Sequence, residues 1–311
     1  MNFQRYLSAK RTVDERAIDR GVEARLAEEL RGRDAPDRDA LCVLEVGSGI
    51  GSTVTRLLDR SWFPDRVDYT ALDIRSENVA AARERLPSWA AARGFAVRRA
   101  GESADGSADG SARPRARADD RFVLSRGQRR AEVRFRTADA FDFLAETDRE
   151  FDLVVAHAFV DLVDPADALA AFRRALAPDG LAYCPITFDG ETGFDPVSDP
   201  DLEARLLDTF HRHLDASGDS RAGRHLLATA SATGEVLAAA GSDWVVYPRD
   251  GGYPADEAYF LDCIVEMVAG AVRKEGKIDA ERVAAWADRR REQITDAKLV
   301  YCAHQLDLLV R

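Results

Sequence analysis

The sequence LCVLEVGSGIG, residues 41–51, decides the fold expected for this chain. A run of apolar residues, interrupted only by Glu45, leads into a turn with glycine at positions 47, 49 and 51. Such a run is typical of a buried strand, and glycine lets the turn after it approach a ligand closely. The spacing is G-x-G-x-G, whereas a dinucleotide-binding turn has G-x-G-x-x-G. The segment therefore predicts a nucleoside-binding turn of another kind, with an ordinary tight turn as the alternative.

A second apolar strand is expected at residues 67–73, after a short amphipathic helix that begins at Ser52. It ends in Asp73, and an acidic side chain at this place accepts the ribose hydroxyls of an adenosine in the related dinucleotide fold. The alternative is that Asp73 only forms the turn before the helix that begins near Ser76.

Further strands are expected at residues 133–141, 151–159 and 181–188, with helices between them. This alternation predicts a parallel sheet with right-handed crossovers and ligands at the carboxyl ends of its strands. That edge carries Gly47, Asp73, Asp139 and His157. Residues 242–248 and 298–310 are expected to close the sheet as its sixth and seventh strands.

Residues 38–188 resemble the class I S-adenosylmethionine (SAM)-dependent methyltransferases, whose first motif is the G-x-G-x-G turn. The turn Ala177-Pro178-Asp179-Gly180 before the fifth strand is a second hallmark of that family. The resemblance implies an α/β fold: a three-layer, Rossmann-like, seven-stranded sheet with an antiparallel last strand. It also implies SAM as the cofactor and methyl transfer as the reaction.

The resemblance further implies which residues contact the cofactor. Asp73 is expected at the ribose and Asp139 at the adenine amino group, although only the motif favours Asp139 over Asp142, the expected cap of the next helix. The full expected set is Glu45, Gly47, Ser48, Gly49, Gly51, Asp73, Ile74, Asp139, Ala140, His157 and Arg11.

Residues 1–37 are expected to form a helical lead-in to a methyltransferase domain at residues 38–311. The capping box Thr12-x-x-Glu15 and apolar residues at every fourth position predict a helix over residues 12–31. Before it, Arg11 is the cation expected to hold the cofactor's carboxylate, with Tyr6 covering the site, and a solvated tail is the alternative.

Three insertions interrupt the expected domain. Residues 100–131 are small, polar and charged, which predicts a mobile loop, with residues 121–125 able to pair with residues 133–137 as a hairpin. Residues 189–220 and 249–294 each carry amphipathic helices, and both follow strands at the cofactor edge. We therefore expect them to form a helical cap over the methyl acceptor.

The acceptor side of the site is less defined by the sequence. The sulfonium methyl is already activated, so in-line SN2 transfer chiefly requires a positioned acceptor atom, which is open between O, N, C and S. The segment Ala156-His157-Ala158-Phe159 lacks the Asn/Asp-Pro-Pro-aromatic signature of enzymes that methylate amino groups of nucleic acids and proteins, so a small-molecule acceptor is expected. His157 is the candidate base, with simple packing as the alternative. The residues expected to line the pocket are Phe188, Tyr253 and Tyr259, although such aromatics also serve as core.

The composition argues against nucleic-acid binding, a membrane span and a zinc site. A net charge of −11 opposes nucleic-acid binding, and the apolar stretch 260–272 is too short for a membrane span, so a cytoplasmic protein is expected. The four cysteines lack the paired spacing of a zinc site, and no metal is expected.

Two other functions remain open. A non-catalytic SAM-binding protein would not need the paired insertions. An aminopropyl transferase would need carboxylates after the fourth strand, where Asp161 and Asp164 lie, although Asp164 is also the expected cap of a helix. A nicotinamide oxidoreductase is disfavoured by the glycine spacing.

Overall fold

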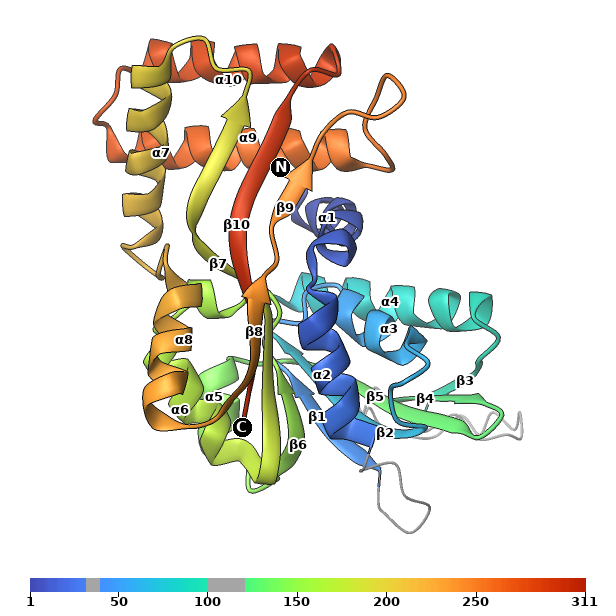
Figure 1. The fold of residues 1–311 in the computed structure, drawn as a ribbon. Helices are drawn as coiled ribbons and strands as arrows, with labels where there is room; N and C mark the ends of the chain where they lie inside the picture. Colours follow the sequence, from blue (N-terminus) through green and yellow to red (C-terminus); the bar gives the residue numbers. More distant parts are fainter. Residues whose placement is uncertain (32–39, 100–120) are drawn as a thin grey trace, which may run out of the picture. The chain divides into compact units, whose positions relative to one another are not determined.

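The computed structural model describes residues 1–31, 40–99 and 121–311 and divides into two compact units (Figure 1). The glycine-loop unit comprises Leu26–Val155 and Arg174–Leu181. The helical-cap unit comprises Met1–Arg25, Ala156–Arg173 and Ala182–Arg311. The expected boundary at residue 37 and the loop expected at residues 100–120 lie outside the described residues. Among the described helices, none is long and apolar enough to cross a membrane.

The glycine-loop unit is built on a sheet in the order β3-β4-β5-β2-β1-β6. Strands β5, β2, β1 and β6 are parallel, and β3 and β4 add an antiparallel edge. The strands are β1 (Leu41–Glu45), β2 (Arg66–Asp73), β3 (Ala96–Arg99), β4 (Arg121–Arg126), β5 (Arg129–Thr137) and β6 (Phe151–Val155). Its helices are α3 (Ser52–Asp59), α4 (Ser76–Ala92) and α5 (Ala140–Glu146). The expected hairpin is confirmed as an antiparallel pairing of β4 with β5, but its register is corrected, because residues 121–126 pair with residues 129–134 and not with 133–137.

The strands of the helical-cap unit surround β10, which pairs antiparallel with both β7 and β8 (Figure 1). They are β7 (Leu176–Asp195), β8 (Val236–Gly241), β9 (Trp244–Val246) and β10 (Val300–Val310), and β7 begins in the other unit. The expected α/β fold with an antiparallel last strand is therefore confirmed.

The sixth strand differs from the sequence expectation. Of the strand expected at residues 242–248, only residues 244–246 form a strand, β9, which pairs with β10. The strand β8, which ends before Ser242, was not expected and pairs with another part of β10. Residues 236–241 read VLAAAG, and alanine is the strongest helix former, so the sequence did not indicate a strand there. Pairing with β10 outweighs that local preference.

The N-terminal segment is also corrected. The single helix expected over residues 12–31 is two helices, α1 (Phe3–Ala17) and α2 (Arg20–Arg31). Asn2 caps α1, whereas the Thr12 hydroxyl donates to Glu257. Asp19 accepts from the backbone N–H of Val22 and so begins the second helix. Since Tyr6 is buried within α1, the solvated tail is excluded.

The break between helices α1 and α2 is held in place by a buried carboxylate on β10. Asp307 is fully buried and accepts from the backbone N–H of Asp19 at 2.8 Å and of Ile186 at 2.7 Å. Ile186 has a φ of 57°, a conformation that β-branched residues rarely adopt, so the bond to Asp307 holds a strained point of β7.

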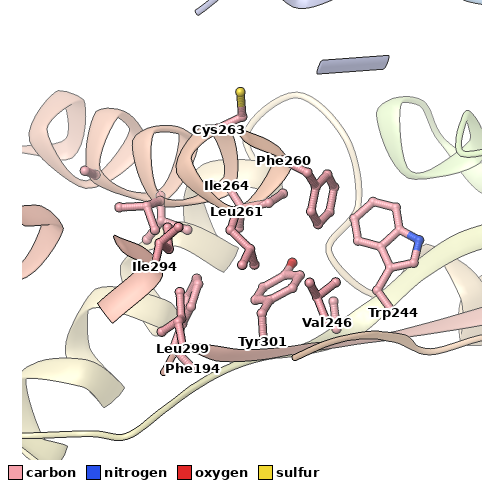
Figure 2. Packing of buried hydrophobic residues seen from close by; sticks show 14 of the residues in the cluster. Phe194, Trp244, Val246, Phe260, Leu261, Cys263, Ile264, Ile294, Leu299 and Tyr301 are labelled. Atoms are coloured by element: carbon pink, nitrogen blue, oxygen red, sulfur yellow. The ribbon is translucent and has the colours of Figure 1, made fainter. Parts of the chain in front are cut away.

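The helices of both insertions pack on one another. Helix α9 contacts α7 and α10, and α1 also contacts α9. Figure 2 shows the aromatic core below α9, where Trp244, Phe260 and Tyr301 meet edge to face. The remaining helices of this unit are α6 (Pro165–Ala175, whose end lies in the other unit), α7 (Pro200–Leu214), α8 (Ala222–Thr233), α9 (Glu257–Glu275), α10 (Ala280–Thr295) and a short 3₁₀ helix (Val160–Leu162).

Two buried carboxylates join elements within this unit. Glu257, at the start of α9, accepts two hydrogen bonds from Arg16 and one from Thr12, both on α1. Glu203, on α7, accepts from Trp286 and pairs at 2.7 Å with Arg290, both on α10. Arg290 is only 2% exposed, so its charge depends on Glu203 for compensation.

Candidate active site

The glycine turn after β1 has the backbone conformation that glycine permits. Gly47, Gly49 and Gly51 have φ values of 64°, 54° and 76°. The backbone N–H of Ser48 donates to the carbonyl of Leu72 on β2 at 2.7 Å, which fixes the turn against the neighbouring strand. A side chain at any of the three glycines would therefore strain the turn.

Gly51 serves the packing of the helix that follows. It is the N-cap residue of α3, and a Cβ there would lie 3.2 Å from the Phe135 ring and 3.3 Å from Ala82. The third glycine therefore lets α3 lie close to β5 and α4. Its expected role as a cofactor contact stays a prediction.

Asp73 links the turn to the next helix. One carboxylate oxygen accepts from the backbone N–H of Gly49 at 2.8 Å. The other accepts from the backbone N–H of Arg75 at 2.8 Å and from the Asn78 amide at 3.1 Å. Asp73 thus has the turn-forming role that the sequence left as an alternative, and it also holds the glycine turn. Its expected contact to the ribose stays a prediction. The next residue, Ile74, is 66% exposed and offers an apolar surface beside it.

Glu45 is buried within the sheet. It accepts a hydrogen bond from the Tyr69 hydroxyl on β2 at 2.9 Å. Burial raises the pKa of Glu45 to about 7, although Tyr69, Thr53 and Arg56 act in the opposite direction. The contact ties β1 to β2 directly below the glycine turn.

Asp139 is the N-cap residue of α5, which corrects the expectation that Asp142 has this role. Oδ1 of Asp139 accepts from the backbone N–H groups of Phe141 and Asp142 at 2.8 and 3.1 Å. Ala140 begins the helix and is buried. Gly47, Asp73 and Asp139 each follow or end a parallel strand of one unit, so the structure brings these three to one edge of its sheet.

In the helical-cap unit, His157 belongs to a charged cluster centred on Asp14. Oδ2 of Asp14 lies 2.5 Å from Lys10 Nζ and 3.0 Å from His157 Nε2, and Oδ1 accepts from the Trp244 indole at 2.9 Å. Burial raises the pKa of Asp14, but the Lys10 ammonium and His157 outweigh it and hold that pKa well below its usual range.

This geometry assigns the tautomer of His157. A carboxylate only accepts hydrogen bonds, so Nε2 must carry the proton that Asp14 receives, and Nδ1 holds the lone pair when the ring is neutral. Lys10 Nζ lies 3.5 Å from the same Nε2. The cluster therefore places the Asp14 carboxylate behind the His157 ring, on the side of Nε2.

Sequence reasoning missed Asp14. Lys10 and Asp14 are four residues apart on the buried face of α1, beside Tyr6, Ala9 and Val13. A charged i,i+4 pair on an apolar helix face indicates a buried ion pair. That pattern was hidden because the helix was expected to begin only at Thr12.

The other expected site residues lie in different surroundings, and the contacts of Phe188, Tyr253 and Tyr259 are each to a different residue. Arg11 is exposed on α1, in contrast to the adjacent Lys10. The Phe188 ring contacts His211, and the Tyr253 hydroxyl donates to the carbonyl of Leu299 at 2.8 Å. The Tyr259 hydroxyl lies 3.0 Å from the backbone nitrogen of Asn2. Their shared pocket stays a prediction.

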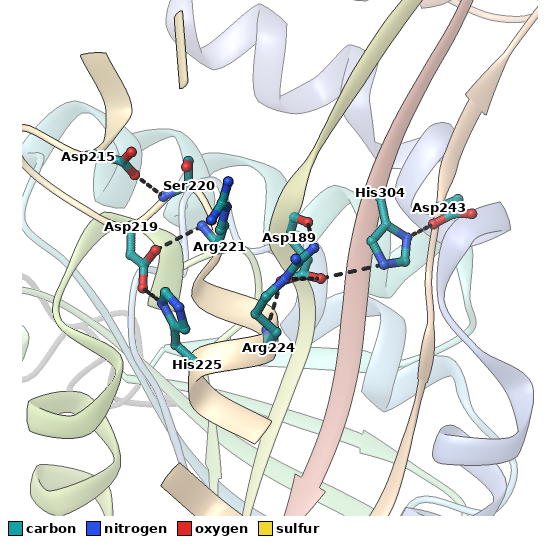
Figure 3. A network of polar contacts seen from close by, with 9 residues as sticks. All are labelled: Asp189, Asp215, Asp219, Ser220, Arg221, Arg224, His225, Asp243 and His304. Atoms are coloured by element: carbon teal, nitrogen blue, oxygen red, sulfur yellow. Dashed lines mark hydrogen bonds and ion pairs between the residues drawn. The ribbon is translucent and has the colours of Figure 1, made fainter. Parts of the chain in front are cut away.

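A second polar network joins β7, α8 and β10 (Figure 3). Asp189 accepts from Arg224 at 2.9 Å, and His304 lies between Asp189 and Asp243, at 2.6 Å from the latter. These groups pair with one another and so stabilise the sheet edge. Within the described part of the chain, no group of three or more His, Cys, Asp or Glu residues is arranged to hold a metal ion.

Comparison with known proteins gives one family. A family model described as a methyltransferase domain matches residues 11–190, more than half of the chain. A search of curated proteins found no match.

Solved structures resemble the chain at low identity. A putative type II methyltransferase from Anaeromyxobacter dehalogenans has 15% identity and a TM-score of 0.44, over 92% of this chain and 95% of that one. Geranyl diphosphate methyltransferase in complex with SAM has 11% identity and a TM-score of 0.40, over 92% and 83%. The mycolic acid cyclopropane synthase CmaA1 in its apo form has 14% and 0.41, over 93% and 89%.

Proposed function

We propose that this chain, which belongs to the methyltransferase family, transfers the methyl group of SAM to a small-molecule acceptor by in-line SN2 displacement. The observation that carries the proposal is the Asp73 carboxylate bonded to Gly49 within a turn of three left-handed glycines. The turn and the carboxylate form a polar surface at the ends of the parallel strands β1 and β2. The related dinucleotide-binding fold binds adenosine at this place.

The family match confirms the class I assignment made from the sequence. The placement of β10, antiparallel between β7 and β8, agrees with the seventh strand of that class. Methyltransferases of this class use SAM, so the expected cofactor is confirmed at the level of the family.

The residues proposed to hold SAM are assigned to different parts of the cofactor. Asp73 would accept the ribose hydroxyls, and the exposed side chain of Ile74 would cover one face of the adenine. Oδ1 of Asp139 caps α5, which leaves Oδ2 for the adenine amino group. The remaining proposed contacts are Glu45, Gly47, Ser48, Gly49, Gly51, Ala140, His157 and Arg11.

On the acceptor side, we propose His157 as the base. SAM, when bound, would supply a methyl group that is already activated on its sulfonium, and the imidazole of His157 would accept the proton that the acceptor atom releases. Asp14 fixes the ring and stabilises the imidazolium that forms, as a carboxylate does behind other catalytic histidines. Phe188, Tyr253 and Tyr259 remain the proposed aromatic lining of the acceptor pocket.

The competing functions can be separated by calorimetry. Asp164 caps α6 by accepting from the backbone N–H groups of Ala166 and Asp167, so an aminopropyl transferase would lack one of its two carboxylates. Titration with SAM, S-adenosylhomocysteine and NAD tests the cofactor directly. Binding of NAD in place of SAM would overturn the proposal, and binding without transfer would favour a non-catalytic SAM-binding protein.

Replacing Asp73 by alanine is expected to weaken binding of S-adenosylhomocysteine by about 1 to 3 kcal/mol, because ribose hydroxyls lose their acceptor. Isothermal titration calorimetry measures the change. Asn78→Ala, which removes one hydrogen bond to Asp73 and keeps the carboxylate, is the control and should cost less. Equal affinity of the Asp73 variant and the native protein would reduce Asp73 to a turn residue.

Replacing His157 by alanine is expected to lower the rate of methyl transfer by about 100-fold, a typical contribution of a general base. The acceptor would first be isolated from a metabolite extract by transfer of labelled methyl. A loss that shrinks as the pH rises indicates a base, because hydroxide then deprotonates the acceptor. An equal loss at every pH would leave His157 a positioning residue. SAM affinity should change little, since Asp73 and Asp139 are assigned the main contacts.

A further inference from the structure

Asp161, in the 3₁₀ helix Val160–Leu162, has a firmly held backbone. Its carbonyl accepts from the backbone N–H of Asp219 at 3.0 Å. A Cβ at the neighbouring Gly218 would lie 2.2 Å from that carbonyl oxygen, so only glycine allows the contact. The side chain of Asp161 therefore starts from a fixed position within the helical-cap unit.

One oxygen of the Asp161 carboxylate is left without a hydrogen-bond partner by the described part of the fold. Its Oδ1 is buried and has no hydrogen-bond partner among the described residues. Lys10 is the cation that acts on it, but the ammonium of Lys10 is bonded to Asp14 at 2.5 Å. A buried carboxylate oxygen without a hydrogen bond is costly, and proteins retain such atoms where a ligand completes them.

The charges around Asp161 favour a cationic ligand. The Asp219 carboxylate adds negative charge, although it also accepts from His225 at 2.6 Å and from the backbone N–H of Arg221 (Figure 3). Asp161 also acts on Tyr6, on α1, because burial raises the pKa of that phenol and Tyr301, Asp14 and Asp161, among others, raise it further. With Lys10 already paired, the local balance is negative.

We propose that Asp161 binds the methyl acceptor and that the acceptor presents a protonated amine to it. The inference rests on the proposed methyl transfer but concerns only the recognition group of the acceptor. Burial raises the pKa of Asp161 to about 6, against the effects of its own backbone and Lys10, with Asp219 adding to the rise. Above that pH the Asp161 carboxylate is ionised, and the positive charge of the protonated amine compensates its negative charge.

The first test measures stability and needs no ligand. When folding raises the pKa of a carboxyl group, the protein loses stability as the pH rises through the folded-state pKa of that group. Asp161→Asn should therefore melt a few degrees above the native protein at pH 7, with the gain shrinking towards pH 4. Asp164→Asn, an exposed cap three residues away, is the control and should show no such gain. A lower melting temperature of Asp161→Asn at pH 7 would give Asp161 a structural role and overturn the proposal.

The second test uses n-butylamine and n-butanol as probes of equal length. Carbon-13 spectra of labelled aspartate carboxyls, assigned with Asp161→Asn, follow the titration of Asp161 in the full chain. Butylammonium should lower its midpoint and bind about 10-fold more weakly to Asp161→Asn, whereas butanol should bind both proteins equally. No preference for the amine would overturn the inference even if SAM binds. Amine binding in a protein that fails to bind SAM would support the site and overturn the proposed methyl transfer.

Discussion

Replacing Gly49 by valine is expected to abolish measurable binding of SAM, a loss on the order of 1000-fold. Gly49 has a φ of 54°, which a β-branched residue adopts only with strain, and its N–H holds the Asp73 carboxylate. Valine would either distort the turn or place its side chain where the cofactor must approach the backbone. Calorimetry with SAM and S-adenosylhomocysteine measures the loss.

Gly127→Val is the matched control. Gly127 lies in the turn of the β4–β5 hairpin with a φ of 59°, and a Cβ there would meet nothing within 4 Å. The two variants should lose similar stability from backbone strain, but only the Gly49 variant should lose the cofactor. If both variants bind SAM as the native protein does, the glycine turn is not the cofactor site.

Replacing Glu203 by alanine is expected to lower the free energy of unfolding by about 3 to 5 kcal/mol. The variant leaves the Arg290 guanidinium buried without its counter-charge and removes the acceptor of the Trp286 indole. Denaturant unfolding followed by tryptophan fluorescence reports the change, because Trp286 lies at the pair itself.

The same two helices offer the control for this buried pair. Arg282, on α10, pairs with Asp199 before α7 at 3.2 Å, and both side chains are 50% exposed. Arg282→Ala should therefore change stability by less than about 0.5 kcal/mol. Replacing Glu203 by leucine and Arg290 by methionine together should recover most of the loss. A double variant as unstable as Glu203→Ala would mean that packing, and not the unpaired charge, sets the cost.

The sheet around the glycine turn could be predicted because its evidence is local. Strands β1, β2 and β6 are mainly apolar segments that are followed by turns, and most of their residues are buried in the structure. The positions of Gly49 and Asp73 follow from those strand ends. In a parallel sheet the ends of neighbouring strands share an edge, so the approach of the two residues could be inferred without coordinates.

The helical-cap unit was harder to predict because its contacts join distant parts of the chain. Asp14 meets Trp244 across 230 positions and His157 across 143. No periodicity in a single segment encodes such a meeting. The strand β8 was missed for the same reason, since its alanines favour a helix locally and only pairing with β10 selects the strand. Asp161 could be named from the sequence as a carboxylate near the site, but its lack of a partner is a property of the folded chain.

The bonds from Asp19 to Asp307 and from Arg16 to Glu257 have a consequence for how the chain is made. Helix α1 is synthesised before its partners on α9 and β10, which emerge more than 200 residues later, on the order of tens of seconds at ordinary elongation rates. Throughout that interval the helix bearing Tyr6, Ala9 and Val13 lacks α9, on which it packs in the folded chain. The glycine-loop unit can therefore fold on the ribosome before helix α1 has its native partners. During that time chaperones have their longest access to the segment that contains Asp14.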